Sequence, residues 1–321
     1  MQISVKQESF RLAKKFVISR GSRDTAEVVT VTVSHDGHVG QGECLPYQRY
    51  NETIESVSQQ IQSIRPPISR QELMTELPPG AARNALDCAL WDLTAKQTGK
   101  PVWQLASLPP PQMVTTAYTI SLSSPDEMYA EAAKNSFRPI LKIKLGGTRD
   151  VERLEAVRHA APDSQLIIDA NESFQIEDLE ANMSTFINLG IKLIEQPLPA
   201  SSDSPLNDFK SPIPICADES CHDVKSLDNL ERKYDMINIK LDKSGGLTEA
   251  IRLYNEAVKR NFKVMIGCMV GTSLGIAPAL TLAVNALVVD LDAPLLLYED
   301  RKHPIRYDKS KIYPAPTALW G

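Results

Sequence analysis

The sequence predicts an α/β fold in which a (β/α) barrel follows a smaller α+β domain. Two observations carry this prediction. Short apolar segments recur about every 20 to 28 residues from residue 114 onward, and most gaps between them have a helical pattern. Charged side chains also recur where successive apolar segments end. Strands that alternate with helices form parallel sheets, and such barrels carry their active sites at the C-terminal strand ends.

The N-terminal domain is predicted over residues 1–110. Residues 2–45 favour an antiparallel sheet, since AEVVTVTVS leads into HVGQGE through an Asp36-Gly37 turn. A helix follows in ARNALDCALWDLTAKQTG, where apolar residues recur at helical spacing before Gly99-Lys100-Pro101 ends it. We therefore expect an α+β domain before the barrel.

The barrel is predicted over residues 111–294. Its eight candidate strands lie near 114–122, 140–145, 165–170, 193–196, 213–217, 236–241, 263–268 and 288–292. Helical patterns between them include DVERLEAVRHA and GLTEAIRLYNEAVKR, each with apolar residues on one face. The Pro-rich tail, residues 295–321, is expected to pack back on the first domain.

Composition narrows the functional classes. With 42% hydrophobic and 23% charged residues and a formal net charge of −5, the chain has the character of an ordinary globular protein without a basic patch, so nucleic acid is not an expected partner. No signal peptide or membrane-length apolar run occurs. Five cysteines, mostly in apolar segments, favour reduced thiols in the cytoplasm rather than disulfides or zinc. A homo-oligomer is compatible with these features.

Two lysines share one face of a predicted strand. Lys142 and Lys144 are separated by one residue in ILKIKL, so both side chains point the same way. Each ammonium group disfavours the charge of the other, which lowers the pKa of one lysine and suits it to act as a base. The K-x-K pattern alone also fits a solvated pair at a strand end.

Three carboxylates follow on successive predicted strands. Asp169, Glu195 and Asp218 end QLIID, KLIE and IPICAD. Each alone could cap a helix or form a salt bridge. Three oxygen ligands at equivalent strand ends, without His or Cys, favour Mg²⁺.

A further lysine, Lys240, ends the strand after Asp218 and is expected to lie across the barrel from Lys144. It could instead form a Schiff base, as in barrel aldolases, but that function would leave the carboxylates without a role. The glycine pairs Gly146-Gly147 and Gly245-Gly246 also follow strands. They favour tight turns, with a phosphate cradle as the alternative.

A serine hydrolase is the main rival from another class. Gly271-Thr272-Ser273-Leu274-Gly275 matches the nucleophile-elbow pattern, and Asp290 or Asp292 and then His303 follow in a suitable order. However, the elbow lies late in the chain, and no H-G-G-G oxyanion motif occurs. The lysines and carboxylates upstream would also have no function. The alternative reading of GTSLG is a βα loop.

With these residues identified, the chain resembles the enolase superfamily, in particular the muconate-lactonizing subgroup, over nearly its whole length. The resemblance rests on ARNALDCALWDL, LKIKL, IIDANES, IEQPLP, ICADES and NIKLDKSGG in family order. It implies a modified TIM barrel, (β/α)7β, with an α+β cap completed by the C-terminal tail. The D-x-D of Asp290 and Asp292 is similar to that of the dipeptide epimerases within this superfamily.

The resemblance also implies roles for the residues. Asp169, Glu195 and Asp218 would bind Mg²⁺, Lys144 and Lys240 would be the acid/base pair, and Lys142 would tune Lys144. Asp290 and Asp292 would receive the ammonium group of a dipeptide. The implied reaction is epimerisation of a dipeptide such as L-Ala-D/L-Glu, with murein peptide recycling in the cytoplasm as its setting.

Alternatives remain within and beyond the family. N-acylamino acid racemase and o-succinylbenzoate synthase activities would leave Asp290 and Asp292 unexplained, and a catalytically silent homologue would retain a full set of site residues without using it. Three arginines, Arg20, Arg23 and Arg49, lie in expected cap-domain loops. We expect Arg23 to pair with an acidic side chain of the substrate.

Overall fold

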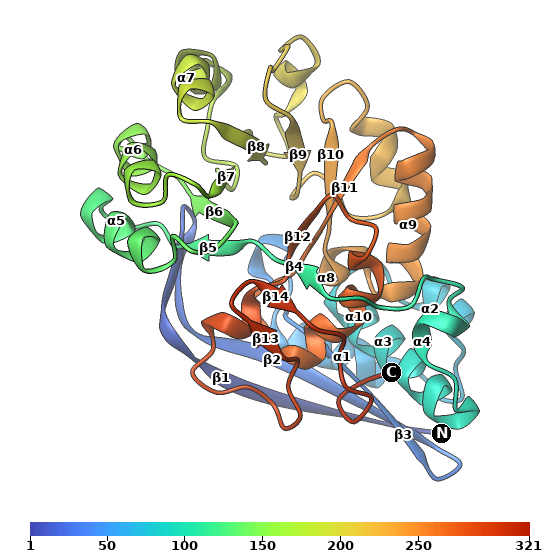
Figure 1. The fold of residues 1–321 in the computed structure, drawn as a ribbon. Coiled ribbons are helices and arrows are strands. Elements are labelled where there is room, and N and C mark those ends of the chain that lie inside the picture. Colours follow the sequence, from blue (N-terminus) through green and yellow to red (C-terminus); the bar gives the residue numbers. More distant parts are fainter.

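The N-terminal domain is built on an antiparallel sheet with helices packed against it. The computed structural model describes residues 1–321, and the sheet runs in the order β1 (Gln2–Ile18), β2 (Gly21–His35) and β3 (His38–Cys44). The remaining elements of this part are η1 (Gln48–Tyr50), α1 (Ile54–Ser63), α2 (Arg70–Glu76), α3 (Ala81–Thr98) and α4 (Val102–Leu105). Together they form the predicted α+β cap (Figure 1).

Eight strands in sequence order form one parallel sheet. They are β5 (Tyr118–Ile120), β6 (Ile140–Lys144), β7 (Gln165–Asp169), β8 (Ile191–Glu195), β9 (Ile215–Ala217), β10 (Met236–Ile239), β11 (Lys263–Gly267) and β12 (Val288–Asp290). The two edges meet where Ala117 N donates to Val289 O at 2.8 Å, beside β5 and β12. This contact closes the sheet into a barrel, which confirms the predicted fold class.

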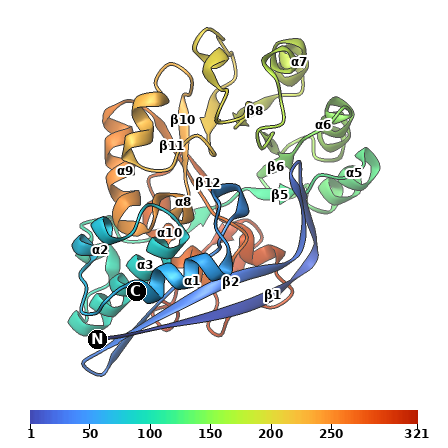
Figure 2. The same cartoon turned by 180° about the vertical axis from the view of Figure 1, so that it is seen from behind.

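Helices cover the outside of the barrel (Figures 1 and 2). They are α5 (Pro125–Lys134), α6 (Asp150–Ala160), α7 (Ile176–Asn188), α9 (Leu247–Lys259) and α10 (Ser273–Ala283). The short helix α8 (Leu241–Ser244) lies in the connection after β10 and contacts α3 of the cap. Only 3₁₀ turns, η2 (Ser204–Asn207) and η3 (Val224–Asn229), follow β8 and β9. Helix α5 illustrates the local encoding of these elements: Ser124 and Glu127 form a capping box, and Pro125 occupies the first turn.

The barrel interior is layered by the two-residue period of its strands. Its lower layer is a small apolar cluster of Ile167, Leu193, Cys216, Met236 and Met265. Side chains two residues further along each strand point the same way, so this spacing places functional groups above an apolar plug. The larger apolar core, a cluster of 54 buried residues, includes side chains from the strands and from the surrounding helices.

The first predicted strand differs from the observed structure. Residues expected as one strand over 114–122 divide into β4 (Val114–Thr115) and β5. β4 leaves the barrel and pairs with β14 (Lys311–Ile312), which pairs in turn with β13 (Tyr307–Asp308). The apolar pattern could not separate these two pieces, because both are short and both pack on the core.

The C-terminal tail contacts the cap as well as the barrel. It begins with η4 (Ala293–Leu296), and the Arg301 guanidinium then pairs with Glu8 at 2.9 Å and Glu43 at 2.6 Å. Trp320 Nε1 donates to Cys88 O at 3.1 Å. The tail thus ties the cap sheet and helix α3 to the barrel.

None of the helices has the length and apolarity required of a membrane span. All five cysteines are free, and all but Cys268 are buried.

Candidate active site

Strand order places the candidate residues around the barrel at regular intervals. Lys144 ends β6 and Lys240 follows β10, four places further along the eight-stranded sheet. They therefore lie on opposite sides of the barrel. Glu195, at the end of β8, lies midway between them, and Asp290, at the end of β12, faces Glu195 from four places away. Lys144 and Lys240 thus lie on either side of the line that joins Glu195 to Asp290.

Each central carboxylate lies against a lysine ammonium group. Lys144 Nζ is 2.5 Å from Asp169 Oδ2, and Lys240 Nζ is 2.7 Å from Asp218 Oδ2. The remaining lysine, Lys142, is 1% exposed and contacts three acids. Its Nζ lies 3.1 Å from Asp169, 2.7 Å from Glu195 and 2.7 Å from Asp290. The predicted side chains therefore form one buried, charged cluster.

The pKa values in this cluster correct one expectation. Mutual repulsion was expected to lower the pKa of a lysine in the Lys142/Lys144 pair. Burial does act in that direction on Lys142, but Asp290, Glu195 and Asp169 outweigh it and raise its pKa well above the usual value. The pKa of Lys240 is also raised, because Asp218 outweighs burial. The carboxylates that the sequence identified as metal ligands and substrate ligands therefore act on the pKa values of Lys142 and Lys240 as well.

The donor set fits a divalent cation. Asp169, Glu195 and Asp218 are 0–2% exposed, and their oxygens are hard ligands of the kind Mg²⁺ prefers. Burial and then the charge of Asp169 raise the pKa of Glu195, because both disfavour its charged form. Glu195 Oε2 also receives no hydrogen bond, although Lys142 Nζ lies 2.7 Å away. The three carboxylates do not converge on one point in this structure, since the lysines lie against them.

Asp290 and Asp292 are buried and partly engaged. Asp290 Oδ2 accepts from Lys142 Nζ at 2.7 Å, whereas Asp290 Oδ1 has no hydrogen-bond partner. Asp292 Oδ2 accepts from Thr119 N at 2.7 Å. Burial and then Asp290 raise the pKa of Asp292. The pair is thus acidic and has spare acceptor capacity, but the structure does not bring it to the wall of the main cavity.

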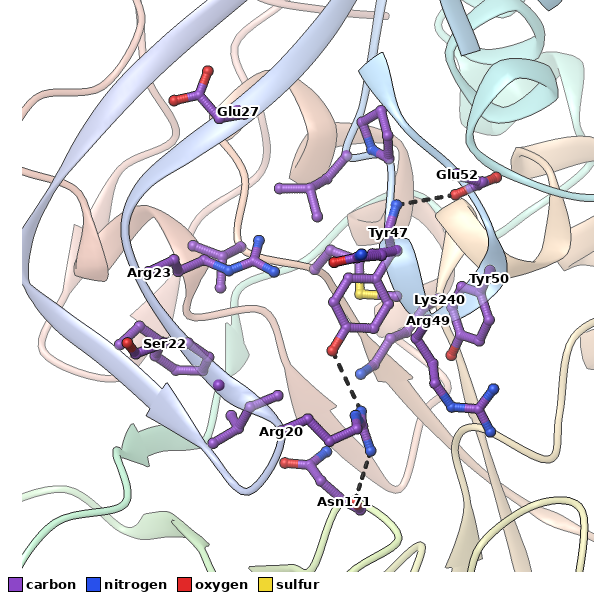
Figure 3. A pocket seen from close by; sticks show the side chains of 18 of the residues that line it. Arg20, Ser22, Arg23, Glu27, Tyr47, Arg49, Tyr50, Glu52, Asn171 and Lys240 are labelled. Atoms are coloured by element: carbon purple, nitrogen blue, oxygen red, sulfur yellow. Dashed lines mark hydrogen bonds between the residues drawn. The ribbon is translucent and has the colours of Figure 1, made fainter. Parts of the chain in front are cut away.

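A cavity of about 780 Å³ lies between the cap and the barrel mouth. Lys144, Asp218 and Lys240 line its barrel side. Arg23 lines its cap side, and Figure 3 shows Arg23 and Lys240 in the wall of the cavity. The Arg23 guanidinium forms no hydrogen bond or ion pair with the protein and lies 5.7 Å from the centre of the Tyr47 ring. Burial lowers its pKa, as expected for a cation without a carboxylate partner.

The other two arginines hold the cap against the barrel. Arg20 donates to Glu219 Oε1 at 2.6 Å and to Asn171 O at 2.6 Å. Arg49 binds both carboxylate oxygens of Glu172 at 2.7 Å. These ion pairs leave Arg23 as the arginine of the three whose charge is uncompensated. The structure therefore separates three residues that the sequence presented as equivalent.

Several residues of the site escaped the sequence argument. Glu219 follows Asp218 directly, is 3% exposed and has one oxygen, Oε2, without a hydrogen-bond partner. Lys243 Nζ lies 2.6 Å from Asp218 Oδ1 and also donates to Asp218 O. Asn238 Nδ2 donates to Glu195 Oε1 at 2.8 Å. Asn238 and Lys240 lie two residues apart on one strand, and this spacing could have identified Asn238.

The serine hydrolase alternative is wrong. Ser273 is fully buried, and its Oγ donates to Asp300 Oδ2 at 2.5 Å and accepts from Ile305 N at 3.0 Å. It therefore holds the tail against α10 and contacts neither His303 nor the acids at 290 and 292. The Schiff-base alternative also loses support, since Lys240 Nζ is engaged in an ion pair with Asp218 at 2.7 Å.

Comparison with known proteins gives a consistent family assignment. Residues 1–106 match the model of the mandelate racemase/muconate lactonizing enzyme N-terminal domain, and residues 127–315 match the enolase C-terminal domain-like model. The L-Ala-D/L-Glu epimerase of Escherichia coli K12 is 44% identical over 97% of this chain and 99% of its own. An N-acetyl-D-glutamate racemase from Pseudoalteromonas is also 44% identical, over 92% of this chain and 95% of its own.

Solved structures agree with these relatives. An enolase family member from Agrobacterium tumefaciens with homology to dipeptide epimerases, with bound sodium and L-Ala-L-Glu, has a TM-score of 0.98 and 49% identity over 99% of both chains. A dipeptide epimerase from Cytophaga hutchinsonii, complexed with Mg and D-Ala-L-Val, has a TM-score of 0.91 and 27% identity over 97% of this chain and 92% of its own.

Proposed function

This chain belongs to the mandelate racemase/muconate lactonizing enzyme family of the enolase superfamily, and from that premise we propose that it is a Mg²⁺-dependent dipeptide epimerase that interconverts L-Ala-D-Glu and L-Ala-L-Glu. The observation that carries the proposal is the placement of Lys144 and Lys240 on opposite sides of the barrel, with acidic groups midway between them. Inversion at a carbon atom requires this geometry, because the proton leaves one face and returns to the other.

The lysines would move the proton. One lysine removes the α-proton of the C-terminal residue, and the electron pair of the C–H bond delocalises into the adjacent carboxylate. The other lysine delivers a proton to the opposite face, and the two exchange roles when the reaction runs backward. Lys142, held by three acids, keeps positive charge beneath the reacting carboxylate without contacting the cavity.

Asp169, Glu195 and Asp218 would hold the cation. When bound, Mg²⁺ would supply the positive charge that stabilises the substrate carboxylate as the α-proton leaves. Relatives support this assignment, since the Cytophaga hutchinsonii epimerase was solved with Mg. Glu195 Oε2, which is buried and receives no hydrogen bond, supports the assignment as well.

The two ends of the dipeptide would bind different charges. Asp290 and Asp292 would receive the N-terminal ammonium group, because both are buried acids and Asp290 Oδ1 still lacks a donor. Arg23 would receive the side-chain carboxylate of glutamate, since it is the uncompensated arginine of the cavity. The cavity wall thus offers Arg23 to a negative group, whereas the two acids lie behind that wall.

The biological setting follows from the substrate. L-Ala-D-Glu is a fragment of murein peptides, so the enzyme would recycle them in the cytoplasm. Five free cysteines fit a reducing compartment.

The proposal is tested by proton exchange. The enzyme, Mg²⁺ and L-Ala-L-Glu are incubated in D₂O, and the glutamate α-proton is followed by NMR. We expect loss of the α-proton signal and appearance of L-Ala-D-Glu. Absence of both deuterium uptake and the epimer would refute epimerase activity.

Replacement of Arg23 by methionine should selectively impair acidic substrates. A hydrogen bond to a charged group contributes about 1.5–3 kcal/mol, so kcat/KM for L-Ala-D-Glu should fall about 10- to 100-fold. Activity on L-Ala-L-Gln should change little. Arg11→Met is the matched control, because Arg11 lies on the neighbouring strand β1 but stacks on Tyr298 outside the cavity. Equal losses on both substrates would show that Arg23 does not bind the side-chain carboxylate.

N-acylglutamate racemisation is the second candidate function. The relative from Pseudoalteromonas is an N-acetyl-D-glutamate racemase, and the ammonium-binding end is already half neutralised, since Lys142 pairs with Asp290. An uncharged acyl group would therefore meet one unpaired carboxylate at this end rather than two. The free-energy cost of burying the acyl group there is correspondingly smaller.

Asp292→Asn separates the two functions. The change removes a charge that would pair with an ammonium group but keeps an oxygen that can accept from Thr119 N. We expect kcat/KM for L-Ala-D-Glu to fall about 10-fold or more, while activity on N-acetyl-D-glutamate is retained or rises. Parallel measurements on both substrates check this, and a uniform loss would contradict the ammonium assignment.

A further inference from the structure

Lys240 lies outside the barrel strands, whereas its counterpart Lys144 lies within one. Lys144 is the last residue of β6 and is paired in register with Asp169 of β7. β10 ends one residue before Lys240, so the lysine lies in the connection to the one-turn helix α8. Lys243 N and Ser244 N donate to Lys240 O, each at 3.0 Å. The placement of Lys240 therefore depends on what holds α8.

The cap domain holds the C-terminal end of α8. Arg83, in the first turn of α3, is 3% exposed. Its Nη2 donates to Ser244 O at 2.8 Å, its Nε donates to Gly245 O at 3.1 Å, and its Nη1 donates to Leu77 O at 3.2 Å. No carboxylate pairs with this buried guanidinium. Its donors instead satisfy carbonyls that a helix end leaves without partners.

Helix α3 also hydrogen-bonds two further residues of the segment that follows Lys240. Asn84 Nδ2 donates to Asp242 Oδ1 at 2.9 Å, and the oxygen also accepts from Leu45 N at 3.0 Å. Asp87 accepts from Thr248 N at 2.9 Å and from Thr248 Oγ1 at 2.6 Å. In both views, α3 lies beside α8 (Figures 1 and 2).

The glycine pair after Lys240 reflects this close approach. A Cβ on Gly245 would lie 2.4 Å from Arg83 Nε, and one on Gly246 would lie 2.5 Å from Asp87 Oδ2. Both residues also have positive φ, +78° and +108°. The pair therefore forms a tight turn packed against α3. For Gly245-Gly246 the structure thus favours the turn over the phosphate cradle.

We infer that helix α3 of the cap positions Lys240 for proton transfer, with Arg83 as the main positioning residue. Lys144, by contrast, is held by its register in β6 and faces the cap across the ring of Phe16, whose centre lies 6.0 Å from Lys144 Nζ. The inference rests on the proposed epimerase function. It gives the cap a role in the chemistry beyond covering the cavity: hydrogen bonds from α3 fix the connection that carries Lys240, whereas Lys144 Nζ donates to Asp169 of the barrel.

Rates of inversion cannot reveal such an asymmetry. Inversion needs both lysines in either direction, and the equilibrium constant fixes the ratio of forward and reverse kcat/KM. Exchange of the α-proton with retention needs one lysine. The lysine removes the proton, its ammonium group exchanges with solvent, and it returns a deuteron to the same face. Each epimer presents its α-proton to one lysine, so retention exchange reports on each lysine separately.

The experiment measures retention exchange of both epimers in D₂O with Mg²⁺. Lys240→Met first identifies the epimer that faces Lys240, as the one whose exchange is lost. Arg83→Met should then slow exchange of that epimer about tenfold or more relative to the other, because a displacement of about 1 Å can cost 100-fold. Asn84→Ala should shift the same ratio in the same direction by a smaller factor.

Arg158→Met is the matched control. Arg158 also donates only to backbone carbonyls, those of Ala161, Pro162, Ser164 and Leu189. It lies on α6, before β7, and contacts neither lysine. We expect this variant to lose stability without changing the exchange ratio.

The outcomes are distinct. A changed ratio in Arg83→Met, or in Asn84→Ala and Arg83→Lys if Arg83→Met does not fold, supports the inference. Equal slowing of both epimers in these variants, or the same change in Arg158→Met, overturns it. Absence of both the epimer and deuterium uptake in the wild-type enzyme would instead remove the proposed epimerase function, so the two failures cannot be confused.

Discussion

Lys240→Met and Lys144→Met should each abolish epimerisation but leave exchange of opposite epimers. General acid–base catalysis contributes about 10²- to 10⁴-fold, so we expect kcat/KM for inversion to fall by about 10³-fold in either variant. The surviving lysine still faces the α-proton of one epimer. Deuterium should therefore enter one epimer with retention in Lys240→Met. In Lys144→Met it should enter the other epimer. NMR of each purified epimer in D₂O measures this directly.

Lys233→Met provides the control for this pair. Lys233 forms an ion pair with Asp203 at 2.7 Å and lies outside the lysine–carboxylate cluster. Its replacement should leave inversion and exchange unchanged. If Lys144→Met and Lys240→Met retained exchange of the same epimer, the lysines could not act on opposite faces, and the two-base mechanism would be wrong.

Glu195→Gln should remove Mg²⁺ binding together with activity. The substitution keeps the shape of a side chain that accepts from Asn238 Nδ2 at 2.8 Å, but it removes one of three negative charges. Loss of an outer-shell partner alone can weaken metal binding by about 100-fold, so loss of a ligand charge should cost at least that factor. Titration calorimetry of metal-free enzyme with Mg²⁺ measures the change, and the rise in Tm on adding Mg²⁺ should disappear.

Glu249→Gln is the corresponding control, because Glu249 is also a buried acid, 6% exposed, but accepts from Val224 N away from the site. It should bind Mg²⁺ as the wild type does. Undiminished Mg²⁺ binding by Glu195→Gln would exclude Glu195 from the ligand set.

Local patterns predicted the main features of the fold. The spacing of apolar segments indicated eight strands, and the observed β5 to β12 all fall within the predicted ranges or overlap them. Residues two apart on one strand share a face, which placed Lys142 with Lys144. Boundaries were less certain, as the division of 114–122 into β4 and β5 shows. Pairing of β4 with β14, from the far end of the chain, decides that boundary.

Electrostatic behaviour was harder to predict. The Lys142/Lys144 pair suggested repulsion and a lowered pKa, yet Lys142 lies within 3.1 Å of acids from three other strands. Which charge dominates depends on distances between strands, and these distances are not encoded in the spacing along any one strand.

The amino-acid sequence by itself determined that lysines and acids would stand at the C-terminal ends of barrel strands, because strand periodicity and strand order follow from local residue patterns. Only the tertiary structure decided which charges compensate one another: Arg20 and Arg49 bind Glu219 and Glu172, and Arg23 is left free in the cavity. It also revealed that Arg83 of the cap holds the turn after Lys240. Ion pairs and hydrogen bonds between segments distant in the chain exist only after the cap has docked on the barrel.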